Sequence, residues 1–141
     1  MFAMQAKGSF EVKITPQPLG HADEGVGGGA GPALGRMLID KQLHGDMEAI
    51  GAGEMLSAGN GAKGSSGAYV AIERVSGTLH GRTGGFVLQH VGLMTRGTPQ
   101  LAITVVPDSG VGELAGIAGS LKVDIIEGKH FYTFDYTLPA P

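Results

Sequence analysis

The chain has 141 residues, a formal net charge of −3, 26 glycines and no cysteine or tryptophan. This length is typical of one domain, and the lack of cysteine excludes a disulfide framework, a thiolate nucleophile and a cysteine-based metal site. The ten lysines and arginines are scattered without a basic cluster, which argues against nucleic acid as a partner.

The sequence also contains no apolar run near the roughly 18 residues that a membrane-spanning helix needs. Its start, MFAMQAKGSFEV, lacks the basic and then apolar pattern of a signal peptide. We therefore expect a cytoplasmic protein without a membrane partner.

The first predicted element is a half-buried strand over residues 6–15, where apolar and charged residues alternate from Phe10 to Ile14 with the period of a strand. Pro16 and Pro18 lack a backbone N–H for the strand ladder, so we predict that they end it. Residues 17–35 (QPLGHADEGVGGGAGPALG) follow and have no periodicity, which predicts a flexible loop. The sequence leaves open whether this loop covers a barrel mouth.

Within this loop, residues 25–30 (GVGGGA) match the form G-x-G-x-x-A of a dinucleotide-binding motif. That motif works only between a strand and a helix whose N-terminus faces the pyrophosphate. Here two prolines and an acidic patch precede it and a predicted strand follows. We interpret it as loop and expect no cofactor.

Further strands are predicted at 36–44, 46–58, 68–75, 76–82, 84–96, 99–106, 121–126 and 130–138. Glycine-containing turns separate them, and we identify no long helix. This pattern predicts an all-β fold, a single closed antiparallel barrel of about eight strands over residues 1–141. Residues 84–96 are apolar on both faces, so we expect the barrel interior to cover one face and a partner the other.

Four segments resemble a known family: GEMLSAG (53–59), YVAIERVSGTLHGRTGGFVLQHVG (69–92), VVPDSGVGELAGIAGS (105–120) and GKHFYTFDYTL (128–138). Together they are similar to an uncharacterised bacterial domain family that itself resembles the allene oxide cyclase barrel, a relative in shape of lipocalins and dirigent proteins. The resemblance implies an eight-stranded barrel with a largely apolar cavity, assembled as a homo-oligomer. It carries over no catalytic residue and no established activity.

Glu54 and Glu73 are the candidate catalytic residues, because each interrupts an apolar strand face. Their neighbours on those faces are Ile50, Ala52 and Leu56 for Glu54, and Tyr69, Ala71 and Val75 for Glu73. Burial would raise the pKa of such a carboxyl group and suit it to general acid or base work. The alternatives are a face open to water or a salt bridge, with Arg74, Arg82 or Arg96 as available partners.

Gln89, His90 and Tyr132 are the candidate ligand-binding residues. His90 shares its strand face with Phe86 and Leu88 and is the histidine most expected to be buried. Tyr132 begins an alternating aromatic row on the last strand, a pattern typical of a packed core or a cavity wall. The five histidines show no close pair of metal-ligand spacing, so no metal site is predicted.

These observations support three hypotheses of function. The leading one is a barrel that binds a small apolar or amphipathic ligand in its cavity. The second is a cyclase or isomerase of the allene oxide cyclase type, in which the cavity orders a reactive chain. The third is an assembly module that holds no ligand.

Overall fold

Period-two alternation organises the chain into nine strands, and the computed structural model, which describes residues 2–23 and 31–140, contains no helix within them. The strands are β1 (Phe2–Gln17), β2 (Ala33–Gly45), β3 (Met47–Gly59), β4 (Gly67–Leu79), β5 (Arg82–Thr95), β6 (Thr98–Val105), β7 (Val111–Gly112), β8 (Ala118–Ile126) and β9 (Lys129–Leu138). In that part of the chain there is accordingly no apolar helix of membrane-spanning length.

Eight of these strands close into a ring. Their order is β4-β3-β2-β1-β9-β8-β6-β5, and β5 pairs again with β4. All of these pairings are antiparallel, and the two-residue β7 adds to β5. The predicted all-β antiparallel barrel of about eight strands is confirmed.

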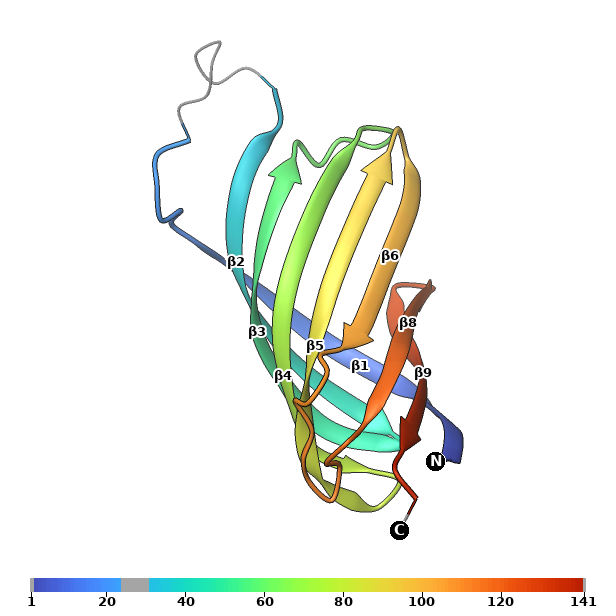
Figure 1. Cartoon of the computed structure of the whole chain (residues 1–141). Coiled ribbons are helices and arrows are strands. Elements are labelled where there is room, and N and C mark those ends of the chain that lie inside the picture. The colour runs from blue at the N-terminus through green and yellow to red at the C-terminus, as the bar shows by residue number, and fades with distance from the viewer. Residues whose placement is uncertain (1, 24–30, 141) are drawn as a thin grey trace.

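The barrel is longer on one side than on the other. β9 pairs with β1 only as far as Phe10, and β8 pairs with β6 only at Ile103 and Thr104. Beyond these residues β2–β6 continue as a curved sheet, which Figure 1 shows projecting past β8 and β9. We call the end at which β8 and β9 complete the ring the closed end. We call the opposite end, where β2–β6 project beyond β8 and β9, the open end.

The closed end contains the packed core. Phe134 is fully buried between the rings of Phe86 and Tyr136, with centroids 5.4 and 5.1 Å away. Both distances are typical of attractive aromatic pairs. The aromatic row of the last strand therefore packs the core, one of the two roles that the sequence allowed.

Several predicted strand limits are wrong. The break predicted between residues 75 and 76 does not exist, because β4 is continuous and turns only at His80 and Gly81. Gly77 pairs in register with Ala49 and Gly84, and it has no side chain because a Cβ would overlap the backbone of β3. A glycine that signals a turn in the sequence thus serves close strand approach.

The first strand also passes its predicted end. Pro16 pairs with Met37 and the strand continues to Gln17, because this segment has a neighbour on one side only and a strand edge tolerates proline. β2 begins at Ala33, so residue 17 and residues 33–35 of the predicted loop over 17–35 belong to strands. Its motif at 25–30 lies outside the described residues.

Replacement of Phe134 by alanine should lower the free energy of unfolding by about 3–5 kcal/mol, because the cavity left at the closed end cannot collapse fully. Urea denaturation measures this loss. As a control, Ile125→Ala removes a side chain that is 66% exposed and should change stability by no more than about 0.5 kcal/mol. Equal effects of the two variants would contradict the placement of the core.

Candidate functional site

A chain of four polar side chains crosses the barrel interior from β2 to β5. Nζ of Lys41 lies 3.0 Å from Oε1 of Glu73, and Nε2 of His90 lies 2.9 Å from the same oxygen. Nδ1 of His90 lies 3.3 Å from the hydroxyl oxygen of Tyr69. We call these four residues the polar cluster. The structure thus brings together Glu73 and His90, which the sequence singled out separately.

Glu73 is the centre of the cluster and is completely buried. Burial alone would raise the pKa of this carboxyl group, but hydrogen bonds from His90 and Lys41 and the charge of Lys41 outweigh it. The pKa therefore lies below its ordinary value of 4.5, and Glu73 is a carboxylate at neutral pH.

Lys41 is the residue that sequence reasoning missed. It lies on the inner face of β2 between Ile39 and Leu43, both buried, and its ammonium group also lies 4.8 Å from the centre of the Phe10 ring. A lysine on an otherwise apolar face is the same signal that identified Glu73. The expected salt-bridge partner, one of three arginines, is therefore replaced by this lysine.

The absence of a side chain at Gly51 leaves room for the Glu73 carboxylate. It stands between Lys41 and Val75 in the strand register, and a Cβ at this position would overlap Oε2 of Glu73. That oxygen is buried and has no hydrogen-bond partner among the described residues. Gly51 therefore allows close packing of β3 against a charged group.

The hydrogen bonds limit the proton positions at His90. A carboxylate can only accept, so Nε2 of His90 is the donor to Glu73, and Nδ1 can accept from the Tyr69 hydroxyl when Nε2 holds the only ring proton. Burial, and then the negative charge of Glu73, raise the pKa of Tyr69. Tyr69 therefore keeps its proton at neutral pH and can donate a hydrogen bond to His90.

Tyr69 also lines a cavity of about 700 Å³ at the open end. The walls include Met55, Met94 and Leu101, which lie on the inner face of β3, β5 and β6 respectively. The β3–β4 loop, residues 60–66, forms the rim. The polar cluster therefore begins at the cavity wall and continues towards the closed end.

The other candidates lie apart from the cluster. Glu54 is on the outer face of β3 with its side chain 56% exposed, where it forms an ion pair with Arg36. Gln89 is on the outer face of β5 and is exposed. Tyr132 is buried at the closed end, where its hydroxyl accepts from the backbone N–H of Met47 and donates to the carbonyl of His44.

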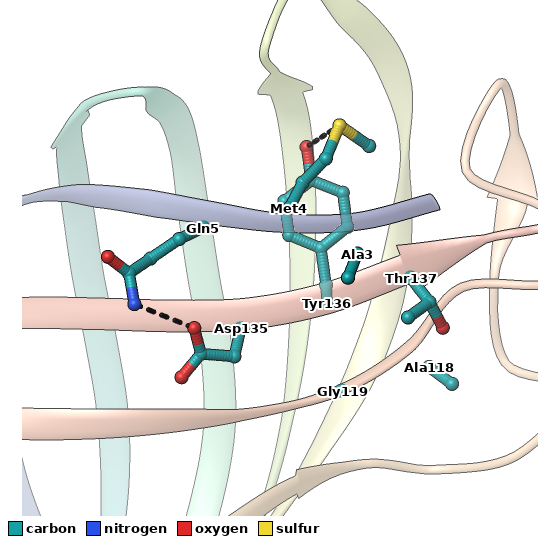
Figure 2. Close-up of a pocket in the computed structure, with 8 residues that line it drawn as sticks. All are labelled: Ala3, Met4, Gln5, Ala118, Gly119, Asp135, Tyr136 and Thr137. Atoms are coloured by element: carbon teal, nitrogen blue, oxygen red, sulfur yellow. Dashed lines mark hydrogen bonds between the residues drawn. The ribbon is translucent and has the colours of Figure 1, made fainter. Parts of the chain in front are cut away.

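A second cavity of about 500 Å³ lies near the chain termini, lined by β1, β8 and β9. Figure 2 shows its polar groups bonded to one another: Gln5 donates to Asp135 at 2.8 Å, and the Tyr136 hydroxyl bonds to the sulfur of Met4. The Tyr136 hydroxyl also bonds to His80, which lies 3.7 Å from Asp46. This second acid–histidine–tyrosine series is half-exposed, and it does not reach the open-end cavity.

Within residues 2–23 and 31–140, no three His, Cys, Asp or Glu side chains are grouped so that they could hold a metal ion. The chemistry that the polar cluster offers is hydrogen bonding and proton transfer.

Removal of one member of the buried pair should be strongly destabilising. Lys41→Met should lower the free energy of unfolding at pH 7 by about 3–5 kcal/mol, because it leaves the Glu73 charge uncompensated. Arg36→Met is the matched control, since the ion pair that it breaks is exposed, and it should cost about 0–1 kcal/mol.

The same variant tests the pKa of Glu73. The pKa of Glu73 is lower in the folded protein than its ordinary value of 4.5. The contribution of the Glu73 carboxylate to the free energy of unfolding is therefore fully present above pH 4.5 and is lost as the pH falls through the folded-state pKa. Without Lys41 that pKa rises, so the deficit of Lys41→Met should shrink between pH 7 and pH 4. Urea denaturation at both pH values measures it, and an unchanged deficit would contradict the assigned charge state.

Comparison with known proteins identifies the family. A model of a family described as a protein of unknown function, DUF3224, matches residues 6–136. A crystal structure of a DUF3224 protein of unknown function from Shewanella oneidensis MR-1 is similar at 46% identity and a TM-score of 0.89, over 99% of this chain and 100% of that one. The comparison with curated proteins gave no match. The expected uncharacterised bacterial domain family is thereby confirmed, and the chain belongs to the DUF3224 family.

Proposed function

We propose that the barrel binds a small apolar or amphipathic ligand in the open-end cavity. The observation that carries this proposal is a cavity of about 700 Å³, within the range of about 300–1,000 Å³ that small-molecule sites occupy. Its walls are mostly apolar, and Tyr69 is one of the lining residues that carry a polar group. Apolar walls with a few placed polar groups are typical of such sites.

The free energy for binding would come from side chains now in contact with water. Leu101 and Met94 belong to the cavity wall, yet they are 48% and 39% exposed. Each Å² of apolar surface that a ligand covers contributes roughly 25 cal/mol. An alkyl chain or a ring system would cover these side chains while its polar group meets Tyr69.

A cyclase or isomerase of the allene oxide cyclase type is the second candidate function. The polar cluster supports it, because a carrier needs only a hydrogen-bonding group at the cavity wall. Three further charged or titratable groups behind Tyr69 are more than ligand orientation requires. The likeness to the allene oxide cyclase barrel belongs to this proposal.

An outer apolar surface supports self-association. Leu56, Val70 and Val91 lie side by side across β3, β4 and β5, with Ile72 and Leu93 beside them, and each is 43–55% exposed. Contiguous apolar surface of this kind marks an interaction site. We propose that a second copy covers it, since a two-fold contact uses the same patch on both copies, and the rim of this outer surface carries both signs of charge.

A thermal-shift screen tests the ligand proposal. The probes are fatty acids, their oxidised derivatives, isoprenoids and aromatic metabolites. A binder at 100 times its Kd should add about 2.7 kcal/mol to the free energy of unfolding, which raises the Tm by several degrees. Leu101→Trp, which fills the cavity, should abolish the shift. Thr104→Trp, on the outer face of the same strand, should retain it. A hit that survives Leu101→Trp would place the ligand elsewhere.

Light scattering after size exclusion tests the self-association proposal. The wild-type chain should elute above its monomer mass of 14.4 kDa, and Val70→Lys should elute as the monomer, because it buries an unpaired charge at the centre of the contact. Ile125→Lys, an exposed apolar residue on β8, is the control and should leave the assembly intact. A monomeric wild type would refute the contact.

A further inference from the structure

We propose that Tyr69 is a catalytic residue that moves a proton on an amphipathic substrate with an enolisable carbonyl group, with His90 and Glu73 as positioning residues. The inference rests on the proposed function, because Tyr69 can reach only a molecule held in the open-end cavity. It goes beyond binding, since the geometry points to a reaction class, an isomerisation by proton shift.

The first support is the order of the groups. The hydroxyl oxygen of a tyrosine at the cavity wall lies 3.3 Å from Nδ1 of a histidine, and Nε2 of that histidine lies 2.9 Å from a buried carboxylate oxygen. In such a series the acid fixes the histidine tautomer and stabilises the imidazolium that forms when the ring accepts a proton. The hydroxyl oxygen of Tyr69 keeps its lone pairs for a group in the cavity.

The second support is the charge balance. The Lys41 ammonium and the Glu73 carboxylate form an ion pair, so their charges cancel. When His90 takes up a proton, its positive charge forms 2.9 Å from Oε1 of Glu73. A low-dielectric interior makes this attraction stronger than it would be in water. The cluster can therefore hold the transferred proton.

The proton shift balances without an oxidant or a further reactant. The substrate C–H bond next to the carbonyl group breaks, and its proton bonds to the Tyr69 oxygen while the Tyr69 hydroxyl proton passes to Nδ1 of His90. The C–H electron pair becomes the C=C bond of an enolate whose charge lies on the carbonyl oxygen. Return of a proton to carbon reverses both transfers and gives the substrate or its isomer.

The second acid–histidine–tyrosine series, formed by Asp46, His80 and Tyr136, differs from the polar cluster in burial and in the bonding of its tyrosine. His80 lies 3.7 Å from Asp46, and both side chains are partly exposed, so water weakens the attraction between them. The Tyr136 hydroxyl is bonded to the sulfur of Met4 and to His80. We assign it a structural role, and His80 therefore provides a matched control.

Deuterium incorporation tests the proposal before the natural substrate is known. The probes are 2-octanone and 2-decanone in D2O, with exchange next to the carbonyl group followed by proton NMR and binding followed by thermal shift. Wild type should exchange the ketones faster than buffer does. Tyr69→Phe, which keeps the ring packed on Gly92, should lower that rate about 100-fold or more without loss of the thermal shift.

Substitution of a positioning residue should lower the rate of deuterium exchange without a comparable loss of ketone affinity. His90→Gln should lower the exchange rate at least about tenfold while the ketone Kd stays within about twofold, and His80→Gln should change neither. A ketone that binds without exchange, or exchange that persists in Tyr69→Phe, overturns the catalytic inference and leaves ligand binding intact. No binding and no exchange also overturns it, and the wider ligand screen then decides the proposed function separately.

Discussion

The fully buried carboxylate of Glu73 constrains more of this barrel than any other single group. A charge in a low-dielectric interior must be paired and hydrogen-bonded, so β2 supplies Lys41 and β5 supplies His90. The intervening β3 supplies Gly51, because a side chain there would occupy the carboxylate position. One buried charge thus determines residue types on four neighbouring strands, and the strand register must hold for all of them at once.

The position of the Glu73 carboxylate follows from the uneven lengths of the strands. β8 and β9 complete the ring only at the closed end, where aromatic rings fill the interior. At the open end β2–β6 continue without them (Figure 1), and β3–β6 line a cavity there. Glu73 lies between the two regions: Val75, the next inward residue of β4, belongs to the core, and Tyr69 belongs to the cavity. The polar cluster therefore connects the solvent-accessible part of the barrel to its dry part.

Much of the fold could be predicted from the sequence, because strand alternation and turn glycines are local signals. The candidate site was harder, and Glu54 and Glu73 show why. Both interrupt apolar strand faces, yet the apolar neighbours of Glu54, Ile50 and Leu56, are more than half exposed on the outer surface. When both faces of a strand are apolar, alternation cannot distinguish inside from outside. Lys41 pairs with Glu73 only through the register of three strands, which no local pattern contains.

Stability alone is a poor reason for the polar cluster. A buried ion pair seldom stabilises a protein more than apolar residues of similar volume would, although loss of one partner is costly. Here the cost is increased by a buried carboxylate oxygen that has no hydrogen-bond partner among the described residues. The closed end, in contrast, is packed with apolar and aromatic side chains. The polar cluster is thus an arrangement that folding does not require, placed where the cavity meets the core.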